Sequence, residues 1–180
     1  MRRFIAAIIV GAALAGAAKA QSVAFRFEWQ GAGGYVMRGG LSFDAALMGE
    51  QLVFETDVDC FVIEGFRDGD PIGRWALGMR TEDTTWRLTF DPVVEQFLVW
   101  GPMSPMPQAW NMDGAGYDCG AGGFGFNIGN AAQDLCLDGE LLTASQVDPS
   151  RPFPALRDDD FAFPADACSG DLLMSRLQQN

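Results

Sequence analysis

The chain has 180 residues, of which 24 are acidic, 12 are basic and none is histidine, so its formal net charge is −12. A chain this acidic lacks the basic face that neutralises nucleic-acid phosphates, which excludes nucleic acid as an expected partner. The lack of histidine excludes His-based catalytic triads and His-ligated transition metals.

Residues 1–20 have the features of a secretory signal peptide. The chain begins Met-Arg-Arg, continues with an apolar run over residues 4–18, and reaches an Ala-Lys-Ala cleavage pattern just before Gln21. The run is too short to span a membrane comfortably, and a buried N-terminal helix is the alternative interpretation. We therefore expect periplasmic or secreted localisation, with no transmembrane segment once the signal peptide is removed.

The mature chain, residues 21–180, has the length of a single domain. It retains nine basic residues, all of them arginine, and all 24 acidic residues, which gives a formal net charge of −15. We interpret this charge as favouring solubility in an exported compartment. Because no lysine remains, Schiff-base and Ser–Lys chemistry are also excluded.

Alternating and apolar runs separated by Gly, Pro and Asp predict short β-strands in the first half of the mature chain. In chain order, strands are predicted over residues 23–29, 35–43, 51–55, 58–66, 72–77, 84–90 and 95–100. Residues 31–34 are Gly-rich and predict a turn. The pair Gly39-Gly40 inside the second strand predicts a bulge or a sharp bend.

Residues 60–90 are the central part of this series. An Asp-Gly-Asp-Pro turn at residues 68–71 separates two β-branched and aromatic runs, which is a strong hairpin signal. In the next run Trp86, Leu88 and Phe90 alternate with polar residues and share one face. We expect the three runs to form a meander whose apolar face packs on a second sheet or closes a barrel.

The second half is richer in Pro and Gly. Residues 101–108 contain three prolines and two methionines, and they predict a connection between two halves of the fold. Residues 110–129 are Gly-rich but follow no βαβ unit, so we expect tight turns around a strand at 124–128 and not a phosphate-binding loop. A hairpin is predicted within residues 134–142. The acidic, Pro-rich segment 146–166 is expected to lie extended and poorly paired over the surface.

These patterns together predict an all-β fold, an antiparallel β-sandwich or barrel with short strands. Four cysteines in an exported chain predict two disulfides, and three pairings are possible. We favour Cys119 with Cys136, which closes a Gly-rich loop, and Cys60 with Cys168, which ties the C-terminal segment to the central strands. A zinc site is disfavoured because no Cys-x-x-Cys spacing and no histidine occur.

Among the five tryptophans and the acidic residues are the candidates for ligand binding or catalysis. Trp100, Trp110 and Tyr117 flank the Pro-rich connection and are candidates for ligand binding, because exposed aromatic rings stack on sugars. Packing in the core is the alternative role for these rings. Glu64 is an acid within an apolar run, and either it serves in catalysis or it points to solvent from the polar face of a strand.

Calcium is the one ion that the composition favours, because the chain is rich in carboxylates. Asp158, Asp159 and Asp160 are the candidate ligands, although surface turns that need no ion are the favoured explanation of the Asp-rich segments. No catalytic residue and no other cofactor are expected. Whether the chain is an enzyme stays open, and the residue inventory favours that it is not.

The functional hypothesis is therefore an exported, non-enzymatic, acidic β-sandwich that acts as a binding or envelope-associated structural module. Its partner would be an unidentified protein or a glycan. One alternative is a carbohydrate-binding module or glycan-active enzyme that uses Trp100, Trp110 and Tyr117. Another is a calcium-stabilised adhesion-type domain.

Overall fold

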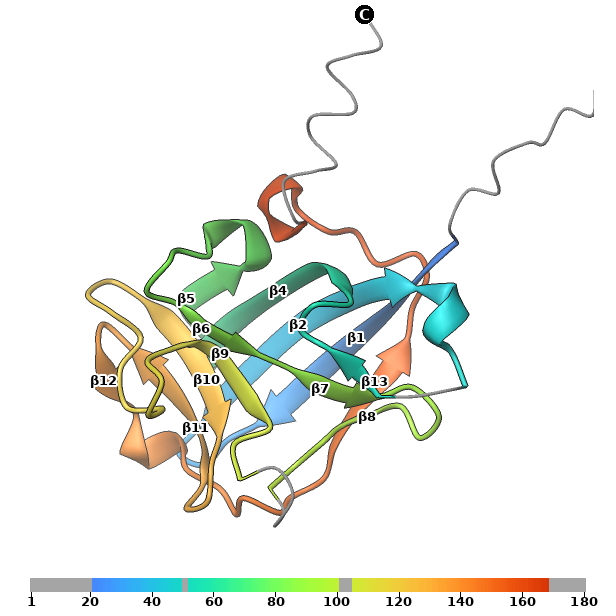
Figure 1. Cartoon of the computed structure of the whole chain (residues 1–180). Coiled ribbons are helices and arrows are strands. Elements are labelled where there is room, and N and C mark those ends of the chain that lie inside the picture. The colour runs from blue at the N-terminus through green and yellow to red at the C-terminus, as the bar shows by residue number, and fades with distance from the viewer. Residues whose placement is uncertain (1–20, 50–51, 101–104, 169–180) are drawn as a thin grey trace, which may run out of the picture.

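The computed structural model describes residues 21–49, 52–100 and 105–168. The predicted signal peptide and part of the Pro-rich connection lie outside these residues. The described chain is all-β, as predicted, and its strands form two antiparallel sheets that pack face to face (Figure 1). Among the described residues the helical elements are four 3₁₀ turns, Ala45–Leu47 (η1), Leu77–Met79 (η2), Thr143–Ser145 (η3) and Ala165–Ala167 (η4).

The larger sheet has eight strands and curls like half a barrel (Figure 1). In spatial order its strands are β3 (Val53–Phe54), β7 (Thr89–Asp91), β8 (Gln96–Phe97), β13 (Phe153–Arg157), β1 (Ser22–Gln30), β2 (Tyr35–Asp44), β4 (Val58–Arg67) and β5 (Asp70–Ala76). The smaller sheet has five strands, in the order β12 (Glu140–Leu141), β11 (Gln133–Leu137), β10 (Phe124–Ile128), β9 (Gln108–Met112) and β6 (Thr85–Arg87).

Two hairpins in the larger sheet follow directly from local sequence. Strands β1 and β2 pair across the Gly-rich turn, and β4 and β5 pair across the Asp-Gly-Asp-Pro turn. Asp68 and Gly69 both have positive φ, 52° and 93°. This is the backbone that a two-residue hairpin turn requires, and Asp and Gly adopt it at low cost.

The predicted third strand of the meander is two strands in the structure. Thr85–Arg87 pairs with β9 in the smaller sheet, whereas Thr89–Asp91 pairs with β3 and β8 in the larger one. The chain crosses between sheets at Leu88, which is fully buried. The prediction that Trp86, Leu88 and Phe90 are buried is confirmed, although Thr89, expected on the polar face, is buried as well. The prediction that these residues form one strand of the meander was wrong.

Aromatic side chains from both sheets fill the space between them. Trp110 of β9 lies at the centre, with its ring 4.8 Å from that of Phe61 and 4.9 Å from that of Phe126. Its exposure is 0%. Trp29 spans the layer and donates a buried 2.8 Å hydrogen bond from Nε1 to Gln133 Oε1. Such a dense aromatic core is the main source of stabilisation expected for this fold.

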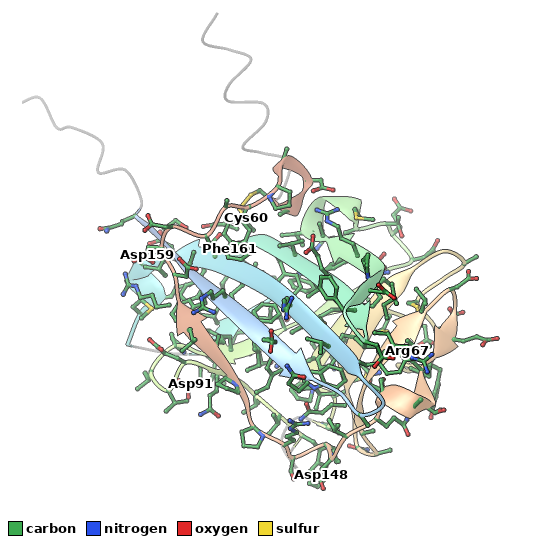
Figure 2. The ribbon with its side chains drawn as sticks, turned by 180° about the vertical axis from the view of Figure 1, so that it is seen from behind. Cys60, Arg67, Asp91, Asp148, Asp159 and Phe161 are labelled. Atoms are coloured by element: carbon green, nitrogen blue, oxygen red, sulfur yellow. A yellow bond between two sulfur atoms is a disulfide. The ribbon has the colours of Figure 1, made fainter. Side chains whose placement is uncertain are left out.

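Part of the outer face of the larger sheet is covered by residues 158–168, which we call the C-terminal strap. Figure 2 shows the strap running over β1 and β2 towards Cys60, with Phe161 on its way. The strap ends at the disulfide between Cys60 and Cys168. The Arg74 guanidinium donates two hydrogen bonds to Asp166, of 2.8 and 2.6 Å. These contacts anchor a segment that forms little regular structure of its own.

The strap also explains the glycine pair in β2. The pairing of β2 with both neighbours runs without interruption through Gly39 and Gly40, so the bulge, one of the two features predicted for this pair, does not occur. The irregularity lies two residues later, between Ser42 and Phe43. Gly40 makes room for the ring of Phe161, because a Cβ at this position would lie 2.5 Å from that ring.

Two further segments depart from or extend the expectations. Segment 146–166 contains β13, which pairs with β1 on one side and β8 on the other, so it is not poorly paired throughout. Phe153 and Ala155 alternate inward and are buried. Their burial favours a strand here in spite of the neighbouring prolines.

The outer face of the smaller sheet is covered by residues 113–123, which the disulfide between Cys119 and Cys136 ties to β11. The two cysteine pairs are the ones favoured from sequence, and each holds a covering segment on the outside of a sheet.

Candidate functional site

The structure separates the three aromatic residues proposed for ligand binding. Trp110 is entirely buried between the sheets and makes no part of a surface, so its assignment as a ligand-binding residue was wrong. The reason is the alternation of β9, which turns Trp110 towards the core and Ala109 towards the outer face. Tyr117 is 67% exposed and lines one region of the surface, and Trp100 is 38% exposed and lies next to that region through its hydrogen bond to Asn130.

That region is a hollow of about 370 Å³ on the outer face of the five-stranded sheet, called here the outer hollow. Its floor comes from β10 and β11, where Asn127 and Asp134 are directly paired across the two strands. Both side chains point outward because the neighbours Phe126, Ile128 and Leu135 point into the core. Its walls come from the covering segment 113–123, the β10–β11 turn and Gln146.

Asp134 is the central polar group of the outer hollow. It is 4% exposed and has no arginine partner among the described residues. Asn127 donates a hydrogen bond to one carboxylate oxygen, and Gln146 donates one of 2.9 Å to the other. Burial raises the pKa of the Asp134 carboxyl, while the hydrogen bonds from Gln146 and Asn127 act in the opposite direction.

The two aromatic residues are placed by hydrogen bonds at the rim. The Nε1 of Trp100 donates to Oδ1 of Asn130, which lines the outer hollow. The backbone N–H of Tyr117 donates to Oδ1 of Asp113 at 2.7 Å, which leaves the phenol ring projecting from the covering segment. Asn127 reaches the same segment by donating to the carbonyl of Gly116 at 3.4 Å. The outer hollow thus combines exposed rings with a buried polar floor.

Two other hollows on the described surface are of similar or larger size. One of about 390 Å³ lies beside the C-terminal strap, over the charged cross-strand residues Glu28, Arg38 and Glu64. Glu64 points outward to solvent there, 3.9 Å from the Nε of Arg74. The structure thus places Glu64 on the polar face of β4. The other, of about 540 Å³, lies at the open edge between the sheets near Trp75. Neither contains a residue singled out from sequence as a ligand-binding aromatic.

The three consecutive acids proposed for calcium begin the strap and have separate roles. Asp158 lies 3.5 Å from the Nε of Arg26. Asp159 accepts hydrogen bonds from Arg157 and from the backbone N–H of Ala24. Among the described residues, no group of three or more acidic or cysteine side chains is arranged to hold a metal ion. Their place in the strap accounts for two of these acids without an ion.

Sequence reasoning missed the polar floor of the outer hollow. Asn127 stands between two apolar residues of β10, and Asp134 directly precedes the Leu-Cys-Leu run of β11. A polar side chain in alternation with a buried run indicates an outward position. What the sequence did not indicate is that this outer face is itself covered, which buries Asn127 and Asp134.

Comparisons with known proteins do not identify a relative: no family model, no curated protein and no solved structure matches the chain. Within the residues that the structure describes, no helix has the length and apolar character to cross a bilayer.

Proposed function

We propose that the chain is an exported, non-catalytic binding module, and that a polyhydroxylated ligand such as a glycan occupies the outer hollow. The observation that carries this proposal is that one hollow combines the exposed ring of Tyr117 with the buried Asp134 carboxylate. Sugars present apolar ring faces and hydroxyl edges, so an aromatic rim and polar floor match both.

The polar floor supports a ligand rich in hydroxyl groups. Asp134 accepts hydrogen bonds, and the side-chain amide of Asn130 has an N–H₂ group that no described residue receives. Trp100 and Tyr117 stand on the same side of the molecule as this floor, within or next to the outer hollow. A hydroxylated ring could therefore stack and donate hydrogen bonds at once.

Binding fits this site better than hydrolysis. A glycosidase requires two carboxyl groups on opposite sides of the scissile bond. Of the described residues that line the outer hollow, Asp134 alone carries a carboxyl group. A site with one carboxylate and aromatic residues is suited to holding a sugar and leaves it intact.

Export is supported by two independent features. The residues before Gln21 have the composition of a signal peptide. The two disulfides, Cys60–Cys168 and Cys119–Cys136, are typical of proteins in an oxidising compartment.

Glycan binding by the mature protein tests this proposal. We expect binding to a neutral oligosaccharide on an array, confirmed by titration calorimetry, and a loss of about fivefold on Tyr117→Ala or Trp100→Ala, since ring stacking contributes on the order of 1 kcal/mol. Phe54→Ala is the matched control, because Phe54 is a 46% exposed aromatic residue that does not line the outer hollow. Equal binding by all variants, or no glycan binding, would reject the proposal.

A further inference from the structure

We propose that the outer hollow prefers a sugar that carries a protonated amine, such as a glucosamine residue, to its neutral or acidic counterparts. This inference rests on the proposed function and adds the charge of the ligand. It is carried by the hydrogen-bonding state of three side chains, Asp134, Asn127 and Gln146.

The three side chains form a set with surplus acceptors. An ionised carboxylate only accepts hydrogen bonds, so both amides must turn their N–H₂ groups towards Asp134. Their carbonyl oxygens, Oδ1 of Asn127 and Oε1 of Gln146, then receive no hydrogen bond from any described residue. An ammonium group has three donors and no acceptor, and it is the group that such a set satisfies best.

The charges around Asp134, Asn127 and Gln146 also favour a cationic ligand. Buried carboxylates in proteins are normally paired with a cation, but Asp134 has only amide partners among the described residues. The described residues that line the outer hollow include no arginine. A uronic acid or a sulfated sugar would therefore meet a carboxylate without compensation, whereas an amine would supply the missing charge.

The rim adds a second contribution. The exposed ring of Tyr117 lines the same hollow and attracts cations through its π face. The chain as a whole is strongly acidic, with 24 acidic and 12 basic residues, and raises the local concentration of cations. Both effects act on an amine and not on its acetylated form.

Titration calorimetry with three probes tests the inference on the mature protein. The probes are a glucosamine oligomer, the N-acetylglucosamine oligomer of equal length and a glucose oligomer, at a pH where the amine is protonated. We expect the amine to bind about tenfold more tightly than either neutral probe. Asp134→Asn should remove this preference, and Glu140→Gln, an equal change of charge at an exposed site on β12, should leave it intact.

Each outcome is decisive. If neutral and amine probes bind equally and Tyr117→Ala weakens both, the amine preference is wrong and the glycan-binding proposal stands. If no probe binds, both are wrong. If Asp134→Asn keeps the preference while its melting temperature shows a folded protein, the assignment to Asp134 is wrong.

Discussion

Phe161 of the strap packs directly on Gly40 of β2, with three ring carbons 2.5 to 2.8 Å from the point where a Cβ of Gly40 would stand. The contact is part of a small apolar cluster outside the sandwich, in which Val62 and Ala76 of the sheet and Ala167 of the strap are buried against one another. The strap is thus packed on the sheet as well as bonded to it. The missing side chain of Gly40 is what allows that packing.

Gly40→Ala should therefore destabilise the protein by about 1–3 kcal/mol, the usual cost of overpacking, because the ring of Phe161 must move away from the sheet. The measurement is the free energy of unfolding in denaturant. Gly114→Ala is the control, since nothing lies within 4 Å of its added Cβ and its φ is not in the left-handed region. Equal stability of the two variants would show that Phe161 does not pack as described.

Loss of the Cys60–Cys168 disulfide should cost about 5 kcal/mol, and loss of Cys119–Cys136 about 3 kcal/mol, from their sequence separations of 108 and 17 residues. Only the first loss should also release the strap. Limited digestion with chymotrypsin should then cut after Phe161 in the Cys60→Ala/Cys168→Ala variant. Cleavage at the same site in the Cys119→Ala/Cys136→Ala variant would argue against separate roles for the two disulfides.

Two buried tryptophans differ in whether their indole N–H has a partner. The Nε1 of Trp110 has no acceptor among the described residues, whereas that of Trp29 donates to Gln133. Trp110→Phe should cost about 1–3 kcal/mol from lost packing and the cavity that it leaves, with no further cost from a lost hydrogen bond. Trp29→Phe should cost about 1–3 kcal/mol more, since it leaves the Gln133 oxygen buried without its donor.

Denaturant unfolding of the two Trp→Phe variants measures this difference. The comparison is matched because both changes remove the same atoms from the same aromatic core. A larger loss for Trp110→Phe would mean that the Trp110 N–H has a partner in solution.

Local signals in the sequence determined what could be predicted of the fold. The turn at Asp68 and Gly69 was predictable because its backbone conformation favours those residue types. The split of residues 84–90 at Leu88 was not predictable, because alternation indicates which face of a strand is buried and does not indicate which sheet the strand joins. Long-range pairing depends on the whole fold.

The candidate site was only partly predictable for the same reason. Tyr117 lies in a Gly-rich loop, where an exposed ring is expected, and the structure places it at the outer hollow. Trp110 sits in an alternating strand whose inward face could not be known until its neighbours were known. Asp134 stands out only because the covering segment buries it, and no local sequence pattern indicates that this segment packs there.

The pH dependence of the free energy of unfolding should show that the Asp134 carboxyl is buried. Burial raises the pKa of its carboxyl, so the folded chain holds this proton more tightly than the unfolded chain does. The corresponding stabilisation is present below the ordinary pKa of Asp and is lost as the pH rises through the raised value. The free energy of unfolding of Asp134→Asn relative to wild type should therefore increase between about pH 3 and about pH 7.

The variant Asp166→Asn should show the opposite pH dependence of the free energy of unfolding. The guanidinium of Arg74 lowers the pKa of the Asp166 carboxyl, so its stabilisation is present above the ordinary pKa and is lost as the pH falls through the lowered value. Relative to wild type, this variant should lose stability as the pH rises through the lowered pKa to just above the ordinary pKa of Asp, and the difference should then stay constant towards pH 7. The same trend in both variants would contradict the burial of Asp134.

The most direct test of the ligand site is the indole region of a proton–nitrogen NMR spectrum during titration with the glucosamine oligomer. The chain has five tryptophans, and Trp100 alone donates its Nε1 proton to a side chain that lines the outer hollow. We predict a progressive shift of the Trp100 indole signal, while those of Trp29, Trp75, Trp86 and Trp110 stay in place. A shift confined to Trp75, which lines the hollow at the open edge between the sheets, or no shift at all, would contradict the account.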